Sequence, residues 1–156
     1  MPRRSERSAG LLTFRRTGAL EVMLAHPGGP LWGKRDAGAW TIPKGLADAE
    51  DNLLATAQRE FTEETGFTAL GAFIALQPVK QKSGKVVHAW AFESNFDASR
   101  FVSNFFEMEW PPKTGRRARF PEIDRLEWFS LAAADEKILP YQQPFLNELK
   151  RKITSE

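Results

Sequence analysis

Two apolar segments open the chain and are separated by a short polar break. Residues 9–16 and 20–26 consist mostly of apolar side chains, and Thr17–Gly18 stands between them. Apolar runs of this length around such a break predict two strands joined as a hairpin. Gly and Pro are then frequent in residues 27–39, which predicts a loop.

The next long segment without breakers is residues 52–65, which are rich in Leu, Ala, Gln, Arg and Glu. These are good helix formers, so the segment predicts a helix. Asp51 or Asn52 can cap its start, and Gly66 stands where a glycine commonly ends a helix.

The remaining residues alternate between short apolar runs, turn residues and helix formers. We expect strands at 40–42, 68–77, 85–93, 105–110 and 125–129, loops at 44–50 and 111–121, and helices at 131–138 and 143–152. Residues 94–104 show no clear pattern. Strands and helices intermixed in this way predict an α/β (α+β) fold, with helices packed on a mixed sheet.

Composition narrows the class of protein. The chain has 156 residues, no Cys, and two His. Its length suits one domain over residues 1–156, of which we expect residues 1–7 to be flexible. The absence of Cys excludes disulfides, Cys-ligated metals and thiol nucleophiles. No apolar run is long enough to span a bilayer, and the basic start lacks the apolar core of a secretory signal. We therefore expect a cytoplasmic protein with no membrane partner.

Charge is unevenly distributed, although the net charge is only +2. Residues 45–64 contain six acids and a single base, Arg59. Residues 111–121 contain four basic side chains and no acid. The net charge alone does not indicate nucleic-acid binding. The two concentrations of charge instead point to separate local functions.

Three of the acids lie on the predicted helix. At about 100° per residue, Glu60, Glu63 and Glu64 form a stripe along the helix. This stripe overlaps the apolar arc that Leu53, Ala57 and Phe61 form. Like charges at this spacing repel, and a partly buried carboxylate is costly unless it is paired or coordinated. Mg²⁺ or Mn²⁺ would satisfy such a cluster. The alternative is an ordinary solvated acidic face with an Arg59–Glu63 ion pair.

The helix and its approach resemble a known motif. Gly45, then Asp51, then REFTEETGF at 59–67 are similar to the Nudix box at almost every fixed position. Asp51 departs from the pattern, because the family has Glu there. The segments SAGLLTFRR, WTIPKG and LEWFSL also occupy places expected of Nudix domains.

The resemblance implies a Nudix-type α/β/α sandwich with a central mixed sheet, and hydrolysis of a nucleoside diphosphate linked to another group. It implies that Glu60, Glu63 and Glu64 bind Mg²⁺ (or Mn²⁺), that the carbonyl of Lys44 is a further ligand, and that Arg59 holds Glu60. Glu60 or Glu63 would orient or deprotonate water. Family members often use one more acid before the late Trp, for which we prefer Glu122; Glu107, Glu109 and Glu127 are the alternatives.

Substrate recognition has weaker signals. The aromatic and basic residues expected to bind substrate are Trp32, Lys34, Arg35, Lys44, Lys82 and Arg117. An aromatic ring can stack on a base and cations can bind phosphate, although each cation is also an ordinary surface residue.

Together these observations predict a Mg²⁺-dependent pyrophosphohydrolase of a nucleoside polyphosphate, with metal-activated water attacking phosphorus. The PKG entry to the box, residues 43–45, resembles the dinucleoside polyphosphate hydrolase branch, which makes a diadenosine polyphosphate the first candidate. Oxidised or ordinary nucleoside triphosphates and RNA 5′ ends are alternatives, RNA being the only nucleic-acid partner considered. A catalytically silent nucleotide sensor is an alternative from another class. The sequence does not indicate the oligomeric state.

Overall fold

The computed structural model describes residues 6–48 and 50–154. Its strands are β1 (Arg7–Arg16), β2 (Leu20–Pro27), β3 (Lys44–Ala47), β4 (Ile74–Ala75), β5 (Val79–Lys80), β6 (Val86–Glu93), β7 (Phe105–Glu109), β8 (Arg117–Pro121) and β9 (Ile123–Ser130). Its helices are α1 (Leu53–Thr65), α2 (Leu131–Lys137) and α3 (Gln143–Thr154), with short 3₁₀ turns at Ala98–Arg100 and Pro140–Gln142.

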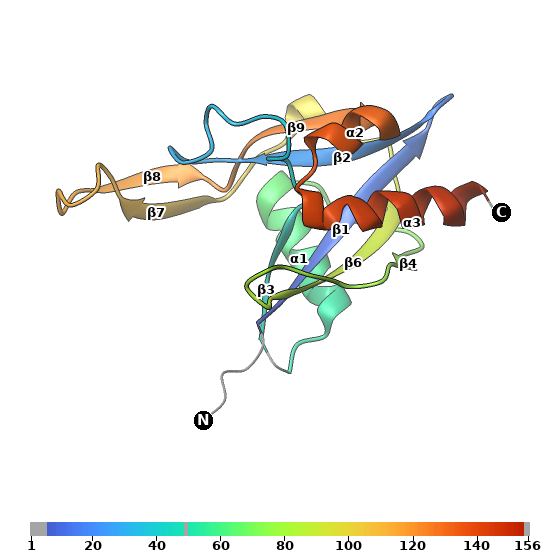
Figure 1. The fold of residues 1–156 in the computed structure, drawn as a ribbon, viewed down its shortest axis with the longest axis horizontal. Helices are drawn as coiled ribbons and strands as arrows, with labels where there is room; N and C mark the ends of the chain where they lie inside the picture. The colour runs from blue at the N-terminus through green and yellow to red at the C-terminus, as the bar shows by residue number, and fades with distance from the viewer. Residues whose placement is uncertain (1–5, 49, 155–156) are drawn as a thin grey trace.

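The central sheet is mixed, as the sequence predicted. Its strands run in the order β4-β6-β1-β2-β9, with β3 paired to β1 and β5 paired to β6. The β1–β6 pair is parallel, and the other pairs in this sheet are antiparallel. Figure 1 shows α1 on one side of the sheet and α2 and α3 on the other. This is the α/β/α arrangement expected from the resemblance.

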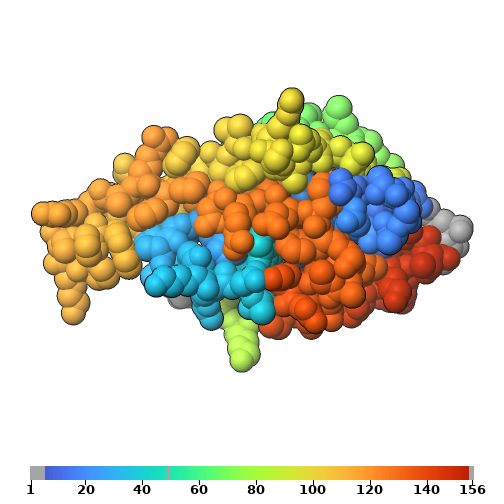
Figure 2. Space-filling view, turned by 90° about the horizontal axis from the view of Figure 1, so that it is seen from above, coloured from blue at the N-terminus to red at the C-terminus, as the bar shows by residue number. Residues whose placement is uncertain are grey.

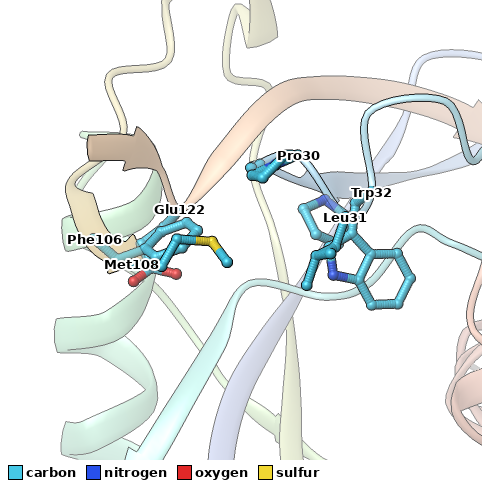
Figure 3. A pocket seen from close by; sticks show the side chains of 9 residues that line it. Pro30, Leu31, Trp32, Phe106, Met108 and Glu122 are labelled. Carbon is cyan, nitrogen blue, oxygen red and sulfur yellow. The ribbon is translucent and has the colours of Figure 1, made fainter. Parts of the chain in front are cut away.

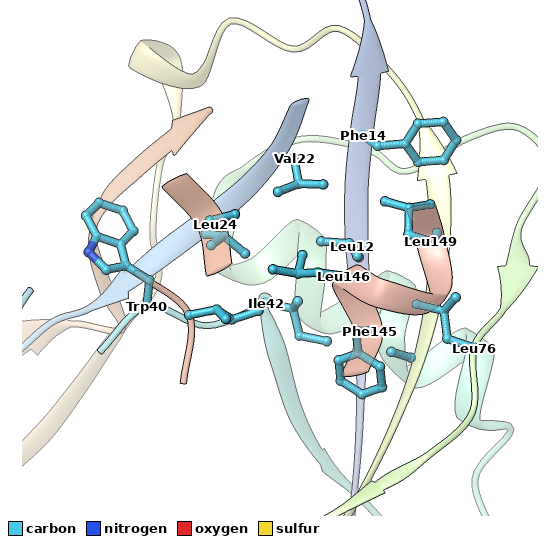
Figure 4. Close-up of a cluster of buried hydrophobic side chains, with 14 of the residues drawn as sticks. Leu12, Phe14, Val22, Leu24, Trp40, Ile42, Leu76, Phe145, Leu146 and Leu149 are labelled. Carbon is cyan, nitrogen blue, oxygen red and sulfur yellow. The ribbon is translucent and has the colours of Figure 1, made fainter. Parts of the chain in front are cut away.

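Both faces of the sheet are buried. Leu12 and Phe14 of β1 pack toward α3 in the cluster shown in Figure 4, whereas Leu11 belongs to a second cluster with Phe61 of α1. Because side chains alternate between the faces of a strand, a strand covered on both sides is apolar throughout. This explains why β1 shows a continuous apolar run rather than an alternating one.

The hairpin of β7 and β8 forms a separate two-stranded sheet. Figures 1 and 2 show it extending away from the rest of the molecule as an arm. Phe106 and Met108 are half-buried on one face of this arm, whereas Glu107 and Glu109 are exposed on the other. The arm therefore presents an apolar face and a charged face.

Three predictions about local structure were wrong. Residues 44–47, expected in a loop, form β3 because they pair with β1. Residues 117–121, also expected in a loop, form β8 because they pair with β7. Of the strand expected at 68–77, only Ile74–Ala75 is a strand, since Gly71 takes a positive φ of 114° that interrupts an extended chain.

Smaller differences concern the short strand at 40–42 and the N-terminus. Trp40 and Thr41 form isolated bridges rather than a strand. The flexible segment expected at 1–7 falls mostly outside the described residues, but Arg7 already belongs to β1. None of the helices within 6–48 and 50–154 is both long and apolar enough to cross a membrane.

Candidate active site

Helix α1 begins and ends as the sequence predicted. Asn52 is the N-cap, with its side chain accepting a hydrogen bond from the Ala55 amide, and Gly66 ends the helix in the left-handed conformation with φ of 79°. Ala57 and Phe61 are fully buried against the sheet. The three glutamates are therefore carried by a helix whose rotation about its axis is fixed by packing.

The carboxylate of Glu60 lies directly against β3. A Cβ atom added to Gly45 would come within 2.1 Å of Glu60 Cδ, so only glycine leaves room for this carboxylate. Arg59 approaches from the helix, with Nη2 at 3.6 Å from Glu60 Oε1 and Nε at 3.9 Å from Glu63 Oε1. Burial raises the pKa of Glu60, the charge of Glu63 raises it further, and Arg59 opposes both. Glu63 itself is far more exposed, with 46% of its side chain accessible.

Glu64 is the most perturbed of the acids. It is 8% exposed, and burial raises its pKa to about 8, with smaller contributions from the charges of Glu60 and Glu122. A hydrogen bond from the Lys44 backbone and the Lys44 charge lower it. Burial lowers the pKa of the Lys44 ammonium, and the charge of Lys85 lowers it further. The ionised form of Glu64 is thus disfavoured in the folded chain.

Glu122 reaches the same region from another part of the chain. It immediately precedes β9, and its charge acts on both Glu60 and Glu64. Burial raises its own pKa. The structure therefore brings Glu122 toward the helix acids that are 58 to 62 positions earlier in the sequence.

The chemistry of these donors fits a hard divalent cation. Among the described residues, no three acidic, His or Cys side chains converge closely enough to enclose an ion as they stand. However, the charges of Glu63 and Glu122 raise the pKa of Glu60, those of Glu60 and Glu122 raise the pKa of Glu64, and Gly45 leaves a recess that Glu60 fills. Carboxylate and carbonyl oxygens are the ligands that Mg²⁺ and Mn²⁺ prefer.

Beside Glu64 and Glu122 lie two adjacent pockets, which we call the polar chamber and the apolar chamber of the cleft. The polar chamber, of about 320 Å³, is lined by Lys44, Glu64, Gln81 and Tyr141 together with apolar side chains such as Ile42 and Leu139. The apolar chamber, of about 400 Å³, has Phe106 and Met108 of the arm on one side and Leu31 and Trp32 on the other, as Figure 3 shows. Both chambers share Pro27, Trp32 and Glu122.

The loop that carries Trp32 is tied to the body of the protein by the buried His26. One ring nitrogen of His26 lies 2.7 Å from Asp124 Oδ1 and the other 2.6 Å from the Arg35 carbonyl oxygen. The guanidinium of Arg35 in turn lies 5.2 Å from the Trp32 ring centroid. The Trp32 side of the apolar chamber is therefore held through the Trp32 ring, which Arg35 contacts, and through the Arg35 backbone, which His26 contacts.

Comparison with known proteins identifies the family. A family model described as NUDIX domain matches residues 4–149. The chain belongs to the NUDIX family. This confirms the resemblance found in the sequence and supports a hydrolase, and NUDIX hydrolases generally use divalent metals.

Solved structures share the fold at low sequence identity. The Caenorhabditis elegans Ap4A hydrolase in a binary complex is 20% identical with a TM-score of 0.69, covering 96% of this chain and 99% of that one. The NUDIX domain of Shewanella oneidensis NrtR, complexed with ADP ribose, is 16% identical with a TM-score of 0.65, covering 98% and 90%. The MutT protein from Methanosarcina mazei Go1 is 21% identical with a TM-score of 0.61, covering 97% of each chain. No curated protein matches the chain by sequence.

The cations expected to bind substrate are only partly gathered at the NUDIX cleft. Lys44 lines the polar chamber, and Arg35 stands beside Trp32. Lys34 and Lys82 do not line either chamber, and Arg117 is paired with Glu107 at 3.6 Å on the charged face of the arm.

The acids considered as alternatives to Glu122 have other surroundings. Glu107 pairs with Arg117, Glu109 accepts a hydrogen bond from the Lys113 amide, and Glu127 lies 4.0 Å from a guanidinium nitrogen of Arg125. None of the three lines the cleft chambers, whereas Glu122 lines both.

Several cleft residues were not predicted from the sequence. Gln81 and Tyr141 line the polar chamber, and Leu31, Phe106 and Met108 line the apolar one. The alternation in FFEME places Phe106 and Met108 on one face of a strand, which is a signal for an apolar face. Gln81 and Tyr141 carry no comparable signal, because they lie 60 positions apart in the sequence.

Proposed function

We propose that this NUDIX protein is a Mg²⁺-dependent pyrophosphohydrolase of nucleoside polyphosphates, with Mn²⁺ as a substitute ion. The observation that carries the proposal is the position of Glu64 and Glu122 in the wall of the polar chamber, next to an apolar chamber that Glu122 also lines. A charged chain of phosphates needs a chamber with charged and polar side chains, and a planar base needs an apolar chamber.

The proposed metal ligands are Glu60, Glu63, Glu64, Glu122 and the carbonyl of Lys44. When bound, the ion would neutralise phosphate oxygens and lower the pKa of attacking water. Arg59 holds the Glu60 carboxylate toward β3. Glu63 is the most accessible of the helix acids and is the proposed acceptor of the water proton, with Glu60 as the alternative.

The two chambers suggest how a nucleotide binds. The base would enter the apolar chamber between Trp32 and Phe106, where aromatic faces are available for stacking. The phosphates would lie in the polar chamber, with the Lys44 ammonium as a cation and Gln81 and Tyr141 as hydrogen-bond donors. Lys44 is thus proposed to serve both through its carbonyl and through its side chain.

A dinucleoside polyphosphate such as diadenosine tetraphosphate is the first substrate to test. The PKG entry at residues 43–45 and the structural likeness to an Ap4A hydrolase support it. Ordinary or oxidised nucleoside triphosphates are the second candidates. An RNA 5′ end has less support, because Arg117 on the arm is already paired with an acid. A single-domain cytoplasmic enzyme acting on small molecules is part of the same proposal.

The test is hydrolysis of a nucleotide panel with Mg²⁺ and with EDTA, in ¹⁸O-labelled water. The proposal predicts Mg²⁺-dependent turnover, with ¹⁸O in one nucleotide product and the greatest activity on the dinucleoside polyphosphate. Preference for an oxidised triphosphate would replace the first substrate by the second. Binding of nucleotide without turnover of any substrate would contradict the enzyme and favour the sensor.

A further inference from the structure

Residues 102–104 cross the C-terminal end of α1 and connect it to the start of β9. On the helix side, the Val102 amide donates to the Thr65 carbonyl at 2.8 Å, and the Asn104 amide donates to the Glu63 carbonyl at 2.9 Å. A Cβ atom at Gly66 would come within 3.2 Å of Val102 Cβ, so the segment lies tightly against the helix end.

The other side of this segment holds the backbone of Glu122. The Glu122 amide donates to the Asn104 carbonyl at 2.8 Å, and the Ile123 amide donates to Ser103 Oγ at 3.0 Å. Ser103 Oγ also donates to the Asn104 carbonyl at 2.8 Å. One residue, Asn104, therefore stands between the main chains of Glu63 and Glu122.

In this connection Ser103 supplies the side-chain contact that reaches β9. The Ser103 hydroxyl accepts from the Ile123 amide and donates to the Asn104 carbonyl, which also accepts from the Glu122 amide. It therefore acts on two consecutive residues, Glu122 and Ile123. Hydrogen bonds of 2.8 to 3.0 Å constrain the separation of the joined groups closely. Residues 103–104 thus connect the main chain of Glu122 to the end of the glutamate helix.

We propose that Ser103 is a positioning residue that holds the main chain of Glu122 beside the end of α1, from where its carboxylate can join the α1 acids as a ligand of one divalent ion. The inference rests on the proposed role of Glu122 as a ligand. Outer residues that orient metal ligands commonly change metal affinity by about 10- to 100-fold when they are mutated. Loss of the hydroxyl leaves the Ile123 amide without its partner and loosens this connection, while the Glu122 main chain keeps its bonds to Asn104 and Gly28.

The experiment is titration of the full chain with Mn²⁺ alone, with free Mn²⁺ measured by electron paramagnetic resonance. Ser103→Ala is expected to weaken Mn²⁺ binding by about 10-fold, and Ser103→Thr, which keeps the hydroxyl, to restore most of it. Ser130→Ala is the matched control, because Ser130 Oγ also accepts from a backbone amide, that of Ala133. It should leave Mn²⁺ affinity within twofold of the parent.

A double mutant separates positioning from a general structural effect. If Ser103 acts through Glu122, Ser103→Ala should weaken binding little further once Glu122→Gln is present. An equal loss in both backgrounds would overturn the inference, as would unchanged affinity in Ser103→Ala when Glu122→Gln weakens binding. Unchanged affinity in Glu122→Gln would instead refute the ligand role itself. Ser103→Cys serves if Ser103→Ala does not fold, with the same expected loss.

Discussion

Glu64→Gln should stabilise the metal-free protein while abolishing its activity. The carboxyl has a pKa of about 8 in the folded chain, against 4.5 for the ordinary group. Each pH unit between those values is worth about 1.4 kcal/mol of unfolding free energy. Because the folded pKa is raised, the stability associated with the protonated form is complete below pH 4.5 and is lost as the pH rises toward 8.

This linkage gives a magnitude for the effect of Glu64→Gln. Relative to low pH, the carboxyl destabilises the folded protein by about 3 kcal/mol at pH 7 and by about 5 kcal/mol above pH 9. Glutamine keeps the shape without the charge, so the variant should gain up to these amounts. The gain would be reduced by whatever the contact with Lys44 contributes.

The assay is urea unfolding in EDTA, at pH 5 and pH 8.5, for the parent and for Glu64→Gln. Glu148→Gln is the matched control, because Glu148 is a buried helix glutamate that has a partner, accepting from the Gln77 amide at 2.6 Å. We expect a stability gain for Glu64→Gln that grows with pH and no gain for Glu148→Gln. A gain for Glu64→Gln that is equal at the two pH values, or a loss at both, would show that ionisation of Glu64 does not destabilise the folded chain.

Three further predictions concern the recess, the base chamber and its loop. Gly45→Ala should lower kcat by about 100-fold, because the new Cβ displaces the Glu60 carboxylate, while the helix content stays unchanged. Turnover measurements check the loss of kcat, and circular dichroism checks the helix content. Trp32→Ala and Phe106→Ala should each raise KM more than they lower kcat, as steady-state kinetics would show, and an unchanged KM would place the base elsewhere. His26→Ala should also raise KM, because the Trp32 loop loses its backbone tie, and hydrogen exchange in that loop should increase.

The glutamate helix could be predicted from sequence because its signals are local. Capping at Asn52, the stop at Gly66 and the overlap of acids with the apolar arc all depend on residues within one or two turns. The partial burial of Glu64 follows from the same rotation, since its neighbours in angle are apolar. The family motif predicts a glycine at position 45, and the physical reason is the Glu60 carboxylate that lies against it.

The parts that were missed depend on contacts distant in sequence. Strand β3 is only four residues long and contains a glycine, and its strand conformation comes from pairing with β1. Strand β8 contains two arginines, and it is a strand because Arg117 and Arg119 face Glu109 and Glu107 across the hairpin. Lys82 and Arg117 are predicted from their charge, and charge does not indicate which way a turn or an arm points.

We propose that Glu60, Glu64 and Glu122 together hold a divalent ion beside the nucleotide cleft. Isothermal titration of the parent and of Glu60→Gln with Mn²⁺ at pH 7.5 tests this proposal without any knowledge of the substrate. We expect saturable binding by the parent and a loss of at least about 10-fold in affinity in the variant. Equal affinity in the two proteins, or no binding by either, would contradict it.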